Sequence, residues 1–150
     1  MSFGPRSVAE LQLARIVAQE RYATIAARNT PIDIKIRYDR KNLSGRAYVI
    51  SRIISVPRPT TRRRLHVYLH EVAHVVLDHQ NQNPRYVEEF QAEQWAFDIM
   101  RKEGVRIPRK ALHEAQRYVK LKIKQALARK AKSIDPAAAK FAKIVVRKPR

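Results

Sequence analysis

LHEVAHVVLDH, residues 69–79, places two histidines four positions apart within an apolar run. On a helix, residues four apart stand on one face, one turn from each other, so the imidazoles of His70 and His74 can reach one metal ion. Glu71 lies beside them, where a carboxylate accepts a proton from the attacking water rather than binding the metal. Buried His and Glu side chains are costly unless they are paired or liganded. A zinc site therefore explains the stretch better than three satisfied core residues do.

A catalytic zinc usually has three protein ligands and keeps one position for water, so a third ligand is needed. His79 lies five residues after His74, a rotation of about 500°, and it faces elsewhere unless the helix ends first. The second candidate ligand lies in a helix predicted to begin near Pro84, after a tight connection at residues 81–82.

If the two helices form an antiparallel hairpin, residues equally far from the turn lie opposite each other. Glu89 is as far from the turn as His74, and Glu93 is as far from it as His70. We therefore predict His70, His74 and Glu89 as the zinc ligands, with Glu93 as an outer acceptor that fixes the tautomer of His70. Glu88, rotated by about 100° from Glu89, is the fallback ligand.

The chain resembles the ImmA/IrrE group of small bacterial and phage zinc metallopeptidases over residues 46–100. The similar segments are RLHVYLHEVAHVVLDH, residues 64–79, and EFQAEQWA, residues 89–96. In that group, an H-E-x-x-H helix precedes an E-x-x-A-(N/D)-x-F-A helix. The resemblance implies zinc as the cofactor and the same roles for four residues, which are His70, His74, Glu89 and Glu71 as the general base.

The resemblance also implies that the strand around residues 53–56 lines the substrate cleft. It suggests a DNA-bound repressor as the substrate. Two residues depart from the group's pattern: Glu93 replaces the usual Asn or Asp, and Trp95 replaces the commoner Phe.

The pattern of the rest of the chain predicts an α+β fold. Helices are expected at residues 7–29, 60–80, 84–102 and 108–132, with a small antiparallel sheet formed from residues 32–37 and 46–56. The sheet should pack on a helical core that contains the H-E-x-x-H helix and the following Glu-bearing helix. Residues 1–132 are predicted to form one minimal zincin-like domain with the basic helix 108–132 docked on it, and residues 133–150 a basic C-terminal tail. Within that tail, Asp135 and Pro136 are typical of a further helix cap and start.

The composition limits the class of protein. The 150 residues contain no cysteine, so neither disulfides nor thiolate metal ligands are available. Residues 1–11, MSFGPRSVAEL, lack the basic segment and following apolar run of a signal peptide, and no apolar run reaches the roughly 18 residues that span a membrane. A cytoplasmic protein without a transmembrane segment is expected, and its oligomeric state is left open.

Positive charge is concentrated in the last third of the chain. The formal net charge is +19, and residues 101–150 contain 17 Lys and Arg against three acidic residues. This excess favours a polyanionic partner, nucleic acid before an anionic membrane surface. The predicted sequence-independent phosphate contacts lie on the basic helix and are Arg109, Lys110, Arg117, Lys120 and Lys124.

Three functions follow as hypotheses, of which the third is a zinc-stabilised toxin or host-interaction protein. The first is a zinc-dependent endopeptidase that acts on a protein associated with nucleic acid. The second is a nucleic-acid-binding accessory or structural protein that retains a peptidase fold with little or no activity. Tyr68 and Tyr86 are candidates to assist hydrolysis, although packing roles are favoured for both, and His66 is expected at the rim or behind the ligands.

Overall fold

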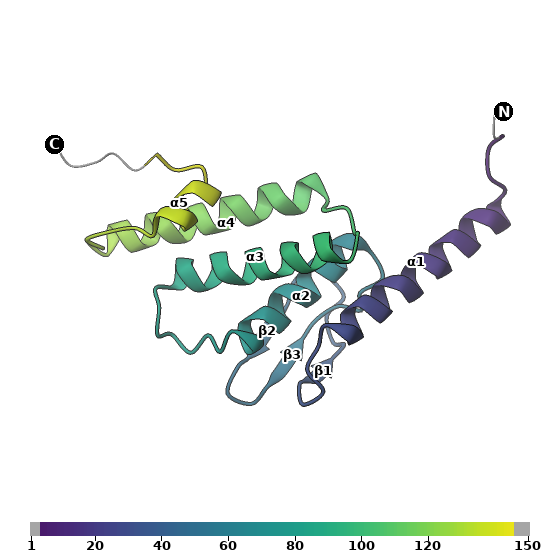
Figure 1. Ribbon diagram of the computed structural model, residues 1–150, viewed down its shortest axis with the longest axis horizontal. Helices are drawn as coiled ribbons and strands as arrows, with labels where there is room; N and C mark the ends of the chain where they lie inside the picture. Colours follow the sequence, from purple (N-terminus) through teal and green to yellow (C-terminus); the bar gives the residue numbers. More distant parts are fainter. Residues whose placement is uncertain (1–3, 146–150) are drawn as a thin grey trace.

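The computed structural model describes residues 4–145 and has five helices and three short strands (Figure 1). In chain order the elements are α1 (Val8–Arg28), β1 (Lys35–Arg37), β2 (Arg46–Tyr48), β3 (Ile53–Ser55), α2 (Arg62–Val76), α3 (Arg85–Lys102), α4 (Arg109–Ala128) and α5 (Pro136–Phe141). The predicted α+β class is confirmed.

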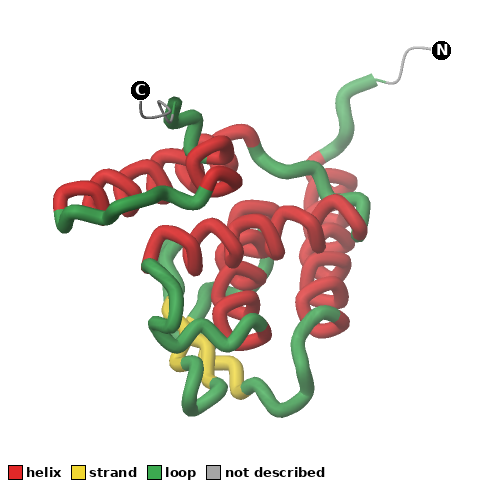
Figure 2. The backbone as a smooth tube through the Cα atoms, turned by 60° about the vertical axis from the view of Figure 1, so that its left-hand side comes forward, coloured by secondary structure: helices red, strands yellow, loops and turns green. Residues whose placement is uncertain are grey.

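The strands lie together at one edge of the helical body (Figure 2). Their order in the sheet is β1-β3-β2. β3 pairs antiparallel with β2 but parallel with β1. The sheet is therefore mixed, and the prediction of an antiparallel sheet is wrong for one of its two pairings. The reason is burial: Ile54 of β3 is fully buried and takes the centre, whereas β1 and β2 each expose two of their three residues. The chain between β1 and β2 crosses to the far edge of the sheet.

α2 is the central helix of the fold. The side chain of Thr61 caps it by accepting a hydrogen bond from the Arg64 N–H at 3.1 Å. Leu65, Leu69 and Val72 are fully buried, because this helix packs against α3, the sheet and the end of α1. The apolar positions that the sequence places around the two histidines thus form the middle of the main core.

α1 contacts the body only through its C-terminal end, where Ile25 and Ala26 are buried (Figure 1). Its first turns project into solvent. Five large apolar side chains there are more than half exposed, namely Val8, Leu11, Leu13, Ile16 and Val17. The sequence correctly predicts the helix, but most of its apolar residues face no partner within residues 4–145.

α4 docks as predicted. Ala115, Val119 and Ile123 lie along its buried stripe. Ala115 joins the main core, and Val119 and Ile123 pack with residues of α3 and α5. α5 lies in the segment that the sequence places in a basic tail, yet it buries Ala138 and Ala139 against the body. The last part of the predicted tail, residues 146–150, lies outside the described residues. No helix within residues 4–145 is long and apolar enough to cross a membrane.

Helices α2 to α5 end in the same way. Each is followed by a residue in the left-handed region, and these residues are Asp78, Gly104, Lys130 and Lys143. In each case the next N–H donates to the carbonyl five residues earlier, which is the Schellman motif. This motif brings the side chains of the two residues it joins toward each other.

Candidate metal centre

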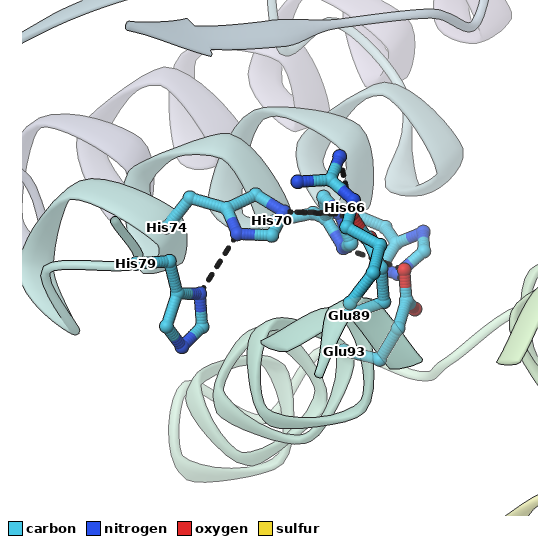
Figure 3. Close-up of polar contacts among 7 residues, drawn as sticks. His66, His70, His74, His79, Glu89 and Glu93 are labelled. Carbon is cyan, nitrogen blue, oxygen red and sulfur yellow. Dashed lines mark hydrogen bonds and ion pairs between the residues drawn. The ribbon is translucent and has the colours of Figure 1, made fainter. Parts of the chain in front are cut away.

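The α2–α3 hairpin brings together the three predicted ligands, His70, His74 and Glu89 (Figure 3). His70 Nε2 lies 3.1 Å from His74 Nε2 and 3.0 Å from Glu89 Oε2. His74 Nε2 lies 3.5 Å from Glu89 Oε1. The two helices therefore pack in the register that the equal distances from the turn predict.

This group could hold a metal ion. Its ligand atoms all lie within 4.8 Å of one another. Tetrahedral ligands at the usual zinc distances stand roughly 3.3 Å apart, close to the three separations in this site. Two imidazoles and one carboxylate form a donor set that zinc accepts, and Glu89 is 2% exposed. Both the spacing and the donors fit a metal.

Glu93 stands behind His70, on the side away from the other ligands. Its Oε1 lies 2.5 Å from His70 Nδ1, and its Oε2 lies 2.8 Å from His66 Nε2. His66 in turn stacks on Phe97 with ring centroids 4.6 Å apart. Glu93 thus lies where the sequence predicts an outer acceptor, and His66 supports it from behind.

The ionisable groups of the site perturb one another strongly. Burial by itself would lower the pKa of His70, but the carboxylates of Glu93 and Glu89 outweigh it and hold that pKa well above the usual value. Burial would raise the pKa of Glu93, but His70 and His66 lower it to about 2. The pKa of Glu89 is likewise far below its ordinary range, because its imidazole partners outweigh burial.

Glu71 faces the cleft beside the ligands and does not belong to the ligand cluster. It is 7% exposed, and burial raises the pKa of its carboxyl, against the opposing effect of His70 and His74. The backbone of Gly45 passes directly over it: a Cβ added at Gly45 would lie 2.7 Å from Glu71 Cγ. A carboxyl of raised pKa beside a metal site is suited to exchange a proton.

His79 returns to the site instead of facing away. Its Nδ1 lies 2.8 Å from His74 Nδ1 (Figure 3). Its Nε2 lies 2.9 Å from the Oε1 of Gln91 on α3. α2 ends at Val76, and the reversal of the chain at Asp78 carries His79 back. Burial, the largest cause, lowers the pKa of His79. The sequence predictions omit Gln91, whose only signal is its place on α3 between Glu88 and Glu93.

Glu88, the fallback ligand, does not join the group. It is 1% exposed, and neither carboxylate oxygen has a hydrogen-bond partner among the described residues. The rotation between neighbouring helix positions directs it away from the two histidines while Glu89 faces them.

A cleft of about 960 Å³ opens onto the site. One wall is the segment around β2, residues 43–51, rather than β3, so the strand expected to line the cleft at residues 53–56 is the wrong one. β3 is the central strand, and β2 therefore presents the free edge of the sheet. Arg85 lies at the rim with its Nη2 2.8 Å from Glu89 Oε1, and it balances the charge of that carboxylate.

The tyrosines divide between packing and the cleft. Tyr68 is fully buried, its hydroxyl lies 2.7 Å from Thr30 Oγ1, and burial raises its pKa to about 12. The hydroxyl of Tyr86 accepts a hydrogen bond from the Asp135 N–H at 2.8 Å. The favoured packing roles of both are thus confirmed. Two other tyrosines line the cleft, Tyr48 of β2 and Tyr118 of α4, and the sequence does not single out either of them.

The predicted phosphate contacts lie along α4 away from its buried stripe. Arg109, Lys110, Arg117 and Lys124 are exposed and Lys120 is half-buried. None of the five forms an ion pair with another described residue. They are thus available as an open basic surface.

Comparison of the chain with protein-family models, curated proteins and solved structures found no significant match. The resemblance to the ImmA/IrrE group stays a prediction made from the sequence motifs. The geometry of the site is thus the basis for a functional proposal.

Proposed function

We propose that this protein is a zinc-dependent endopeptidase. The observation that carries the proposal is the convergence of His70, His74 and Glu89 on one point, with the carboxyl of Glu71 beside it in an open cleft. Zinc bound at such a site lowers the pKa of a bound water to about 7 and polarises the substrate carbonyl.

Glu71 is the residue proposed to move the proton. Its carboxylate accepts a proton from the attacking water and then delivers it to the leaving amine. The raised pKa of Glu71 supports this role, since a stronger base takes the proton more readily. Gly45 leaves the space that this carboxyl occupies.

The form of the cleft favours an extended peptide. β2 is an edge strand, so its outer backbone groups are free to pair with a substrate strand laid along residues 46–48. Arg85 of α3 and Tyr118 of α4 also line the cleft and offer hydrogen-bond donors to the peptide backbone. A groove bounded on two sides suits cleavage within a chain.

The test combines metal analysis with a substrate screen that samples many peptide sequences at once. Purified protein should contain about one zinc per chain. A peptide library derived from a proteome, with cleavage sites read by mass spectrometry, should yield products with wild-type protein and none with Glu71→Gln, because an amide cannot accept the proton. Zinc-loaded wild type that cleaves nothing would contradict the proposal.

A second candidate function rests on the open basic surface of α4. These exposed side chains are suited to contact phosphates without reading bases, which would direct the protein to substrates on nucleic acid. If zinc binding and nucleic-acid binding were found without hydrolysis, a nucleic-acid-binding accessory protein that retains a peptidase fold would replace the first proposal. The peptide screen distinguishes the two functions, because only the endopeptidase should yield cleavage products.

A further inference from the structure

Four helices of this protein end in Schellman motifs, and the contact that accompanies the motif differs in one of them. In α3 the joined residues are Val105 and Met100, with an N–O distance of 2.8 Å. In α4 and α5 they are also apolar, Ala131 with Ala126 and Ile144 with Ala139. An apolar contact between these positions commonly accompanies the motif.

In α2 the same two positions hold histidines. The N–H of His79 donates to the carbonyl of His74 at 3.0 Å, and the N–H of Asp78 donates to that of Val75 at 3.1 Å. The side chains that the motif brings together are therefore two imidazoles, with their Nδ1 atoms 2.8 Å apart. A hydrogen bond replaces the apolar contact at the one helix end that carries a predicted metal ligand.

The direction of the hydrogen bonds follows from chemistry. If His74 Nε2 serves the metal, its neutral ring carries the proton on Nδ1, which then donates to His79 Nδ1. His79 must accept on Nδ1 and so carries its own proton on Nε2, which donates to Gln91 Oε1 at 2.9 Å. The amide oxygen of Gln91 is an acceptor, so the His74–His79 and His79–Gln91 hydrogen bonds each have one donor and one acceptor.

We propose that His79 and Gln91 are positioning residues that hold His74 in the tautomer and orientation required to bind zinc. The inference rests on the proposed zinc site and adds to it a second support: Glu93 fixes His70, and the His79–Gln91 pair fixes His74. The Schellman turn at Asp78 builds this support into the end of the helix.

The experiment measures zinc affinity of the full chain by competition with a chromophoric chelator, with zinc ion alone as the probe. His79→Leu removes the acceptor and should weaken binding about tenfold to a hundredfold, as the loss of an outer partner typically does. His79→Asn keeps an acceptor oxygen near the Nδ1 position and should remain within about threefold of wild type.

Two variants of α3 form a matched pair. Gln91→Leu removes the acceptor for His79 Nε2 and should weaken zinc binding, by less than His79→Leu does. Gln94→Leu makes the same change three residues later, at an exposed side chain with no hydrogen-bond partner among the described residues, and should leave affinity unchanged. If Gln91→Leu and Gln94→Leu both bind as wild type does, Gln91 has no part in the support.

A spectroscopic readout separates the hydrogen bond from mere packing. In zinc-loaded protein with ¹⁵N-labelled histidine, an N–H···N bond between the two Nδ1 atoms should give a scalar coupling across the hydrogen bond. This test uses wild type, so it stands even if His79→Leu fails to fold. Absence of the coupling would overturn the inference.

The affinity series separates failure of this inference from failure of the proposed function. Wild type that binds no zinc would remove the site and its support together. Wild type that binds zinc, with His79→Leu binding equally well, would overturn only the role of His79. Equal losses in His79→Leu and His79→Asn would assign His79 to packing and would also overturn the role proposed here.

Discussion

The backbone of Gly45 lies against the side chain of Glu71, so closely that a methyl group at Gly45 would stand 2.7 Å from Glu71 Cγ and 3.2 Å from its Oε1. Gly45 immediately precedes β2, the strand that borders the cleft. The free edge of the sheet and the proposed general base therefore meet at a position where only glycine fits without displacement.

Gly45→Ala should displace Glu71 and lower hydrolysis about tenfold to a hundredfold, since small misplacements of a reacting group have effects of that size. Zinc affinity should not change, because Glu71 is not a ligand. Steady-state rates on a peptide found in the library screen measure the first effect, and chelator competition the second. Gly4→Ala is the matched control, because nothing lies within 4 Å of Gly4. Equal activity of the two variants would mean that Glu71 tolerates the shift.

Glu89→Gln and Glu88→Gln neutralise adjacent buried carboxylates, but only the first is expected to weaken zinc binding. Glu89 faces the two histidines, so Glu89→Gln should weaken zinc binding by more than the tenfold to hundredfold typical of an outer partner. Glu88 faces away and lacks partners within residues 4–145, so Glu88→Gln should leave zinc affinity unchanged. Zinc content after dialysis distinguishes the two, and a reversed order would exchange their roles.

The zinc-free protein should be most stable between about pH 4.5 and pH 6.5. Glu93 has its pKa lowered from 4.5 to about 2, so its contribution is present above pH 4.5 and is lost as the pH falls through about 2. His70 has its pKa raised above 6.5, so its contribution is present below pH 6.5 and is lost as the pH rises through the raised value. Thermal unfolding in the presence of a chelator, measured from acid to alkaline pH, follows both the loss of stability at low pH and the loss at high pH. Glu93→Gln should reduce the loss of stability at low pH. An unchanged dependence of stability on pH would argue against the pairing of Glu93 with His70.

Asp78 adopts φ 54° at the end of α2. Asp78→Gly should preserve stability, because glycine enters this region freely. Asp78→Val should cost at least about 1–2 kcal/mol, because a β-branched residue is strained there. Denaturant unfolding of the zinc-loaded and zinc-free forms measures both variants. The Val variant should also lose zinc affinity, since the turn carries His79, and normal affinity in a destabilised variant would separate the turn from the metal site.

Arg117, Lys120 and Lys124 provide the test of nucleic-acid contact. Changing all three to Gln should weaken binding to DNA of any sequence and reduce the log–log salt slope by about one unit for each phosphate-binding side chain removed. The matched control removes the same charge elsewhere, by changing the exposed Lys35, Arg37 and Lys41 to Gln. Fluorescence anisotropy at several salt concentrations gives both quantities. Equal weakening by the two triple variants would show that total charge, and not the α4 surface, is responsible.

The ligand triad was predictable because the two helices are antiparallel, so positions equally far from their connection lie opposite each other. This holds although α2 ends at Val76, four residues earlier than expected, and the connection is residues 77–84. Counting from the turn is sufficient to place Glu89 opposite His74 and Glu93 opposite His70. The position of His79 was not predictable from helical rotation, because rotation applies only while the helix continues. Asp78, a residue that tolerates the left-handed region, is the signal that the helix ends there and that His79 turns back.

The sheet was less predictable than the helices. Alternating residues suggest strands but do not determine which strand is central, and that choice depends on tertiary burial of Ile54. The choice of central strand also determines which strand borders the cleft. Because β3 is central, the cleft is bordered by β2 and not by β3 as expected. The roles of Gln91 and Tyr118 were not predictable from the residues around them, because those roles depend on which other helices pack against α3 and α4.

α1 combines two environments in one continuous helix, and the rate of amide hydrogen exchange should divide it accordingly. Its last turns hold Ile25 and Ala26 in the core, so their amides should exchange only when the body opens. The first turns have exposed side chains and only the helix's own hydrogen bonds, and a free helical segment shorter than about 12–15 residues is marginal in water. Amides near Leu11 should therefore exchange orders of magnitude faster than those near Ile25, with the transition falling where the helix first meets α2.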